Sequence, residues 1–169
     1  MTCAEIMTPE PKMCVPEDSV SAAVDIMWDC DCGAVPVVKD MDSKELVGII
    51  TDRDIAMHVV KHAHAHPSEA KVDDCMSFPA VYVLLEDPVE KVTESMGENQ
   101  IRRIPVVDQD RSCVGIISQA DLMSRLTGTE ALEAVYAILR QISVSRSKNK
   151  EESAKTDTNA KKNDTDKEI

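Results

Sequence analysis

Apolar residues are spaced three and four positions apart in two segments of the chain, a pattern that predicts one buried face on a helix. An acidic residue precedes each stripe, Asp18 in the first and Asp87 in the second. Asp87 is suited to cap its helix, and Pro88 is suited to the first helical turn. We therefore predict two amphipathic helices with similar starts. The first stripe comprises Val20, Ala23, Val24 and Met27, and the second comprises Val89, Val92 and Met96.

Continuous apolar runs, too short for helices, follow each stripe and are joined by charged turns. Such runs are typical of short strands that are largely buried. The pattern predicts a hairpin of two strands in each half, followed by a helix from Asp52 to about His62 and another from Gln119 to Leu126. The runs are AVPVV at 34–38, ELVGIIT at 45–51, IPVV at 104–107 and CVGIIS at 113–118.

The second half of the chain repeats the first. GIITDRD at 48–54 returns as GIISQAD at 115–121, and Met7-Thr8 returns as Met76-Ser77. A motif that recurs within the same order of elements indicates duplication of one structural unit. Because one unit buries too little surface alone, the two copies should pack sheet to sheet about a pseudo-twofold axis.

The duplication sets the expected domain organisation. We predict an α/β (α+β) fold of two β-α-β-β-α repeats, residues 1–66 with the linker and residues 67–127. A further amphipathic helix is predicted for residues 128–144, and the polar residues 145–169 are expected to form a disordered tail. The helix covers the body of its own chain or meets a second copy. Its apolar stripe is Leu132, Val135, Leu139 and Ile142.

Charge and hydropathy exclude some classes of partner. The 169 residues carry a net charge of −12, and the acidity lies in the body because charges nearly balance in 145–169. An acidic surface repels the phosphate backbone, so nucleic acid is not an expected partner. No apolar run approaches the roughly 20 residues of a membrane span. Because Met1 leads directly into the first repeat without a leader, we expect the cytoplasm.

The sequence has six cysteines and four histidines, which suggest a metal or redox sensor as a further hypothesis. Cys30 and Cys32 lack the second pair that a zinc site normally needs. His62, His64 and His66 alternate, so an extended chain would place them on one side. Reduced thiols and a solvated linker are favoured, and we predict no metal site.

The Gly-x-x-(Thr/Ser)-x-x-Asp motif, present twice behind a Pro-Val-Val strand, resembles a tandem pair of cystathionine-β-synthase-type (CBS) domains, often called a Bateman module. The resemblance covers about residues 1–126 and leaves no room for a catalytic domain, so it implies a stand-alone module that is not an enzyme. It also implies two symmetry-related clefts between the sheets. Because such modules usually pair, it favours a homodimer to which the helix of residues 128–144 contributes.

The motif places Thr51 and Asp54, and again Ser118 and Asp121, where a strand turns into a helix. A hydroxyl followed three residues later by an acid also forms a simple helix cap. In the family the acid accepts hydrogen bonds from ribose hydroxyls, and the Thr or Ser contacts phosphate or ribose. A helix N-terminus attracts phosphate in any case, so capping and binding are compatible.

The two implied sites differ in positive charge. Arg102 and Arg103 directly precede Ile104 and Pro105, where the family often carries a His or Arg that reaches towards phosphate. The first repeat lacks this pair and has Arg53 within its motif instead. Since each cleft borrows groups from both repeats, the pair can serve either site. Surface ion pairing is an equally weighted alternative for these arginines.

The adenine side of the two sites also differs. Val81 suits an apolar slot for the base, whereas Lys12 occupies the matching place in the first repeat. Lys12 departs from the small aliphatic residue usual in the family, so we expect the first site to be the weaker one or to be absent. Its long stem can alternatively carry the ammonium group to a phosphate.

These features predict a non-enzymatic sensor of an adenine-containing ligand. The candidates are AMP, ADP, ATP, NAD(H) and S-adenosylmethionine. No cofactor is required, although Mg²⁺ can accompany ATP or ADP. The alternative function is a ligand-free scaffold dimer that serves protein–protein contact. The sequence names neither the ligand nor the regulated partner.

Overall fold

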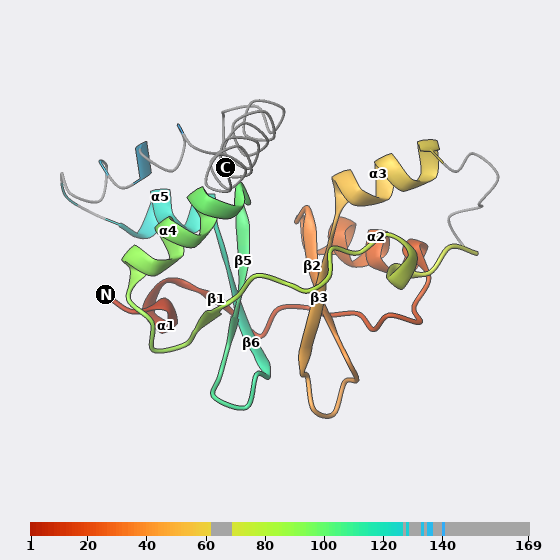
Figure 1. The fold of residues 1–169 in the computed structure, drawn as a ribbon, viewed down its shortest axis with the longest axis horizontal. Coiled ribbons are helices and arrows are strands. Elements are labelled where there is room, and N and C mark those ends of the chain that lie inside the picture. The colour runs from red at the N-terminus through yellow and green to blue at the C-terminus, as the bar shows by residue number, and fades with distance from the viewer. Residues whose placement is uncertain (62–68, 127, 129–132, 134, 137–139, 141–169) are drawn as a thin grey trace, which may run out of the picture.

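The computed structural model describes residues 1–61, 69–126, 128, 133, 135, 136 and 140. Within this part of the chain, two β-sheets lie side by side, each accompanied by helices (Figure 1). The mixture of helices and strands confirms the predicted α+β class. No helix among the described residues has the length and apolar character that a membrane span requires. His62, His64, His66 and the predicted tail lie outside the described residues.

The first repeat builds a two-stranded sheet between two helices of the chain. Helix α2 (Val20–Asp29) leads into β2 (Ala34–Val38), which pairs antiparallel with β3 (Leu46–Thr51), and α3 (Asp52–Lys61) follows directly. Strand β2 is buried along its whole length, as a continuous apolar run requires. The predicted hairpin and the helix that follows it are confirmed.

The second repeat has the same order of elements. Helix α4 (Val89–Asn99) precedes β5 (Arg103–Val107) and β6 (Cys113–Ser118), and α5 (Gln119–Arg125) follows. Its sheet is extended to four strands in the order β1-β6-β5-β4. The added strands are β4 (Val83–Leu84), which runs parallel to β5, and β1 (Thr8–Pro9), which comes from the start of the chain and pairs with β6.

The leading segment of each repeat packs against the other repeat. Helix α1 (Cys3–Ile6) buries Cys3 and Ile6 in an apolar cluster with residues of α4, β5 and α5. The short 3-10 helix η1 (Val72–Asp74) buries Val72 in the cluster of the first repeat. The sequence division near residue 66 therefore follows the duplication, while each core receives residues from both repeats.

The two hairpin turns hold the sheets together at one end of the molecule. The amide of Leu46 donates to the carbonyl of Arg111 at 3.0 Å, and the amide of Cys113 donates to the carbonyl of Lys44 at 2.8 Å. Each bond is the counterpart of the other under exchange of the repeats. A cluster beside them takes two residues from each sheet, so the predicted sheet-to-sheet packing is confirmed. Its members are Val38, Leu46, Val107 and Cys113.

Both amphipathic helices are confirmed, but Asp87 does not cap the second one. Pro88 takes the N-cap position of α4, and the helix begins at the next residue. The Asp87 carboxylate instead accepts from the amide of Leu84 at 2.7 Å, just as Asp18 accepts from the amide of Val15 at 2.9 Å. Short acidic side chains bind nearby backbone amides readily, and here they close the turn that precedes each helix.

The described part of the predicted C-terminal helix packs on the second repeat of its own chain. Val135 is 6% exposed and belongs to the cluster around α1 and α5, whereas Tyr136 is 64% exposed. At Val135 the apolar stripe therefore covers its own core, which is the interpretation that we did not favour. Leu132, Leu139 and Ile142 lie outside the described residues.

Candidate functional site

In the first repeat the candidate binding residues lie where β3 ends and α3 begins. The amide and the hydroxyl of Thr51 donate to Oδ2 of Asp54 at 3.1 and 2.7 Å, and the Asp54 amide donates back to the hydroxyl at 3.1 Å. This reciprocal arrangement is a capping box. The two bonds from Thr51 engage Oδ2 of the Asp54 carboxylate.

The second repeat has the same box, with both oxygens of its carboxylate engaged. The amide and the hydroxyl of Ser118 donate to Oδ2 of Asp121, and the Asp121 amide donates back at 3.2 Å. The hydroxyl of Thr8 donates to Oδ1 at 3.5 Å, and Nε of Arg125 lies 3.7 Å from the same oxygen. Both oxygens of the Asp121 carboxylate therefore have neighbours within the second repeat or at the start of the chain.

The two adjacent arginines have different surroundings. Arg102 is exposed, and its carbonyl accepts from the amide of Gln119 at 2.9 Å. Arg103 is half-buried, and its guanidinium reaches the first repeat: a methyl group on Gly33 would lie 3.1 Å from Arg103 Nη2 and 2.8 Å from Asp52 Oδ2. The structure thus brings Arg103 to the N-terminal end of α3, which carries the first candidate site.

The remaining candidate residues lie at the surface or in the core. Arg53 and Lys12 are exposed. Val81 is partly buried against the core of the second repeat, and Pro105 is buried on β5. Ile104 is fully buried in that same core, so its side chain contacts protein. Of these residues, the exposed pair is the most accessible to a ligand from solvent.

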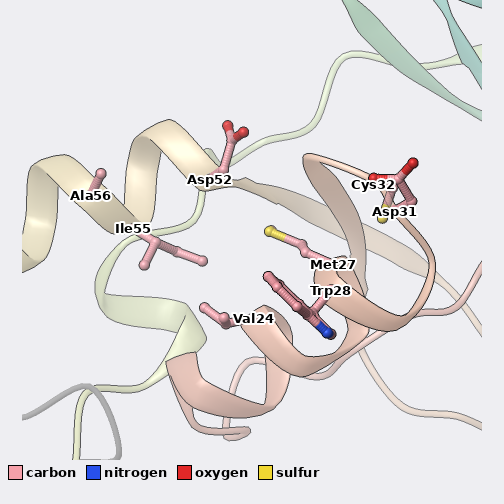
Figure 2. A pocket seen from close by; sticks show the side chains of 8 residues that line it. All are labelled: Val24, Met27, Trp28, Asp31, Cys32, Asp52, Ile55 and Ala56. Carbon is pink, nitrogen blue, oxygen red and sulfur yellow. The ribbon is translucent and has the colours of Figure 1, made fainter.

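A hollow that we did not predict lies between α2 and α3 (Figure 2), with a volume of about 320 Å³. Apolar side chains of both helices line it, and Asp31 and Asp52 are its charged groups. Trp28, the single tryptophan of the chain, is 84% exposed at this hollow. The available signal was the position of Trp28 four residues after Val24, at the edge of the α2 stripe.

The buried cysteines are poorly suited to metal or redox chemistry. Burial raises the pKa of Cys14 to about 12, and the pKa values of Cys3 and Cys113 to about 11. These thiols are protonated at neutral pH, whereas the thiolate is the form that binds metals and attacks disulfides. Across the part of the chain that the structure describes, no three His, Cys, Asp or Glu side chains are grouped to hold a metal ion.

The family model of the CBS domain matches residues 3–61 and again residues 72–128. The chain belongs to the CBS-domain family. The two matches follow the two repeats, so the tandem pair inferred from the duplicated motif is confirmed. Among curated relatives, the uncharacterized protein YlbB of Bacillus subtilis is 36% identical over 135 residues, which cover 79% of this chain and 88% of that protein.

Solved structures of CBS-domain proteins share this fold. Hypoxic Response Protein I with two coordinated zinc ions is 28% identical, with a TM-score of 0.67 over 75% of this chain and 100% of that chain. The CBS pair of protein MJ0100 is 28% identical, and its structure is a complex with 5′-methylthioadenosine and S-adenosyl-L-methionine. The TM-score is 0.62, and the match covers 74% of this chain and 94% of that chain. The hexameric CBS-CP12 protein from bloom-forming cyanobacteria is 30% identical, with a TM-score of 0.64, and the match covers 74% of this chain and 70% of that chain.

Proposed function

We propose that this CBS pair is a regulatory module that binds an adenine nucleotide or an adenosyl compound between its repeats, without catalysis. One observation carries the proposal: the motif carboxylate of Asp54 lies at the start of α3, and the Arg103 guanidinium approaches that helix start from the other repeat. A carboxylate accepts hydrogen bonds from ribose hydroxyls, and an arginine at a helix N-terminus suits phosphate. The adenosyl compounds bound by protein MJ0100 support a ligand of this class.

We further propose that the first repeat holds the stronger site, although Lys12 led us to expect the weaker site there. Arg103 reaches the start of α3, whereas Oδ1 of Asp121 already has Thr8 and Arg125 as neighbours. Lys12 is exposed and leaves no buried charge that would oppose an adenine ring.

The candidate ligands are AMP, ADP, ATP, NAD(H) and S-adenosylmethionine, with Mg²⁺ as a companion of ATP or ADP. The hairpin turns fix one end of the two sheets. A ligand at the opposite ends of the strands would therefore change how the repeats are placed there, and a partner protein would respond to that change. We propose that the module acts in the cytoplasm.

Thermal unfolding in the presence of adenosine, AMP and S-adenosylmethionine tests the proposal. A ligand at 100 times its Kd is expected to stabilise the folded protein by about 2.7 kcal/mol, which raises the melting temperature. Guanosine is the matched control, because it has the same ribose and a different base. A melting temperature unchanged by every adenine compound would support the ligand-free scaffold instead.

We also propose a homodimer, held by the α2–α3 face instead of by the C-terminal helix. Val24 and Trp28 are exposed at the hollow of Figure 2, which Met27, Ile55 and Ala56 also line. Apolar groups gathered on one face mark an interaction surface. The hexameric assembly of the CBS-CP12 protein supports self-association of a related chain. The exposed fractions are 41% for Val24 and 84% for Trp28.

Replacing Trp28 with aspartate is expected to convert this dimer to a monomer at micromolar concentration, because a charge would be buried in the apolar contact. Light scattering measures the mass. Met123→Asp on α5 is the matched control, since Met123 is 62% exposed but lies outside the proposed face. A dimer that tolerates Trp28→Asp, or that Met123→Asp disrupts equally, would contradict the assignment.

A further inference from the structure

Arg103 and Asp52 approach Gly33 from opposite repeats. A Cβ atom placed on Gly33 would lie 3.1 Å from Arg103 Nη2 and 2.8 Å from Asp52 Oδ2, so these two atoms border the space beside Gly33. The amide of Arg53 donates to Asp52 Oδ1 at 2.7 Å, which engages that oxygen while Oδ2 borders the Gly33 space. An anionic carboxylate and a cationic guanidinium therefore flank the same position at the start of α3.

This arrangement is not a consequence of the duplication, because the second repeat has no equivalent. The strand registers make Ala34 the counterpart of Arg103, and the helix starts make Gln119 the counterpart of Asp52. Neither counterpart is charged. The first repeat alone combines a borrowed arginine with an acid at the first position of its helix.

We propose that Asp52 is a specificity-determining residue, which makes the first repeat favour adenosine-like and cationic adenosyl ligands over adenine nucleotides. This inference rests on the proposed function. The Asp52 carboxylate attracts the guanidinium that a phosphate would need, and it repels the phosphate itself. Adenosine has no charge and the sulfonium of S-adenosylmethionine is cationic, so neither ligand meets this opposition.

The expected size of the effect follows from the exposure of the two groups. Asp52 is exposed and Arg103 is half-buried, so water and salt weaken their interaction. Removing the negative charge should therefore improve affinity for a phosphorylated ligand by about two- to fivefold, a range typical of charge pairs near a surface. Affinity for adenosine should stay within about twofold of the wild type, since no ionic partner changes.

The test is the affinity of AMP and of adenosine, measured by titration calorimetry on the full chain. Asp52→Asn should strengthen AMP binding and leave adenosine unchanged. Asp31→Asn is the matched control, because it removes an equal charge from the same hollow and should leave both affinities unchanged. In an Arg103→Gln background the gain from Asp52→Asn should shrink, because the guanidinium is no longer available to the phosphate.

Three results would overturn the inference: equal changes for AMP and adenosine, equal effects of Asp52→Asn and Asp31→Asn, or a gain that persists fully without Arg103. Inorganic phosphate gives a second measurement that needs no adenine site. It should raise the melting temperature of Asp52→Asn more than that of the wild type, at matched ionic strength. If adenosine does not bind the wild type, the proposed function fails, and the phosphate result alone decides for or against Asp52.

Discussion

Replacing Ile6 with alanine is expected to lower the free energy of unfolding by about 3 kcal/mol, the size typical of a large apolar side chain removed from a core. Ile6 is 1% exposed and packs among residues of the second repeat, although it belongs to the first repeat in sequence. The loss should therefore appear as faster hydrogen exchange in α4 and α5, measured beside denaturant unfolding.

Met57→Ala on α3 is the control for this prediction, because Met57 is 61% exposed. It should change the free energy of unfolding by less than about 0.5 kcal/mol, as surface substitutions usually do. A cost at Ile6 as small as the cost at Met57, or a loss of exchange protection confined to α2 and α3, would mean that α1 is not part of the second core.

Replacing Asp54 with alanine is expected to weaken adenosine binding by about 10- to 100-fold, because a charged hydrogen-bond acceptor contributes roughly 1.5–3 kcal/mol. Asp121→Ala should have the smaller effect, since Thr8 and Arg125 already engage that carboxylate. Equilibrium dialysis with adenosine measures both variants against the wild type.

Asp54 also caps α3, so a loss of affinity caused by a destabilised helix must be distinguished from one caused by a lost contact with the ligand. Loss of a cap costs about 0.5–2 kcal/mol of stability. Asp54→Asn retains an acceptor for the Thr51 amide but lacks the charge, so it should fold like the wild type and still bind adenosine weakly. Wild-type affinity in Asp54→Asn with weak binding in Asp54→Ala would assign the carboxylate to capping alone.

Local signals were sufficient to predict most elements of the fold. The AVPVV and CVGIIS runs are largely apolar over too few residues for a helix, and both form strands. AVPVV is buried throughout, while the residues of CVGIIS alternate between buried and partly buried. The duplicated motif then indicated which strands occupy equivalent places in the two repeats, which neither run indicates by itself. The predicted helix cap at Asp87 was wrong because its carboxylate accepts from the amide of Leu84 instead, and local sequence does not decide which nearby amide a short acidic side chain binds.

Contacts between segments far apart in sequence were beyond such signals. Nothing in the residues around Cys3 indicates that α1 completes the core of the second repeat, because a short apolar segment is equally suited to either core. The same holds for Arg103, which the sequence allowed to serve either site. The direction in which the Arg103 side chain points depends on how the two sheets pack and on the space left beside Gly33, which has no side chain.

Titration calorimetry with adenosine tests the central claim most directly. The wild-type protein should give saturable binding, and the double variant Asp54→Ala/Asp121→Ala, with its circular dichroism spectrum unchanged, should give none at the same concentrations. Absence of binding to the wild type, or wild-type affinity in the folded double variant, would contradict the assignment of these strand-end carboxylates to an adenine-ligand site.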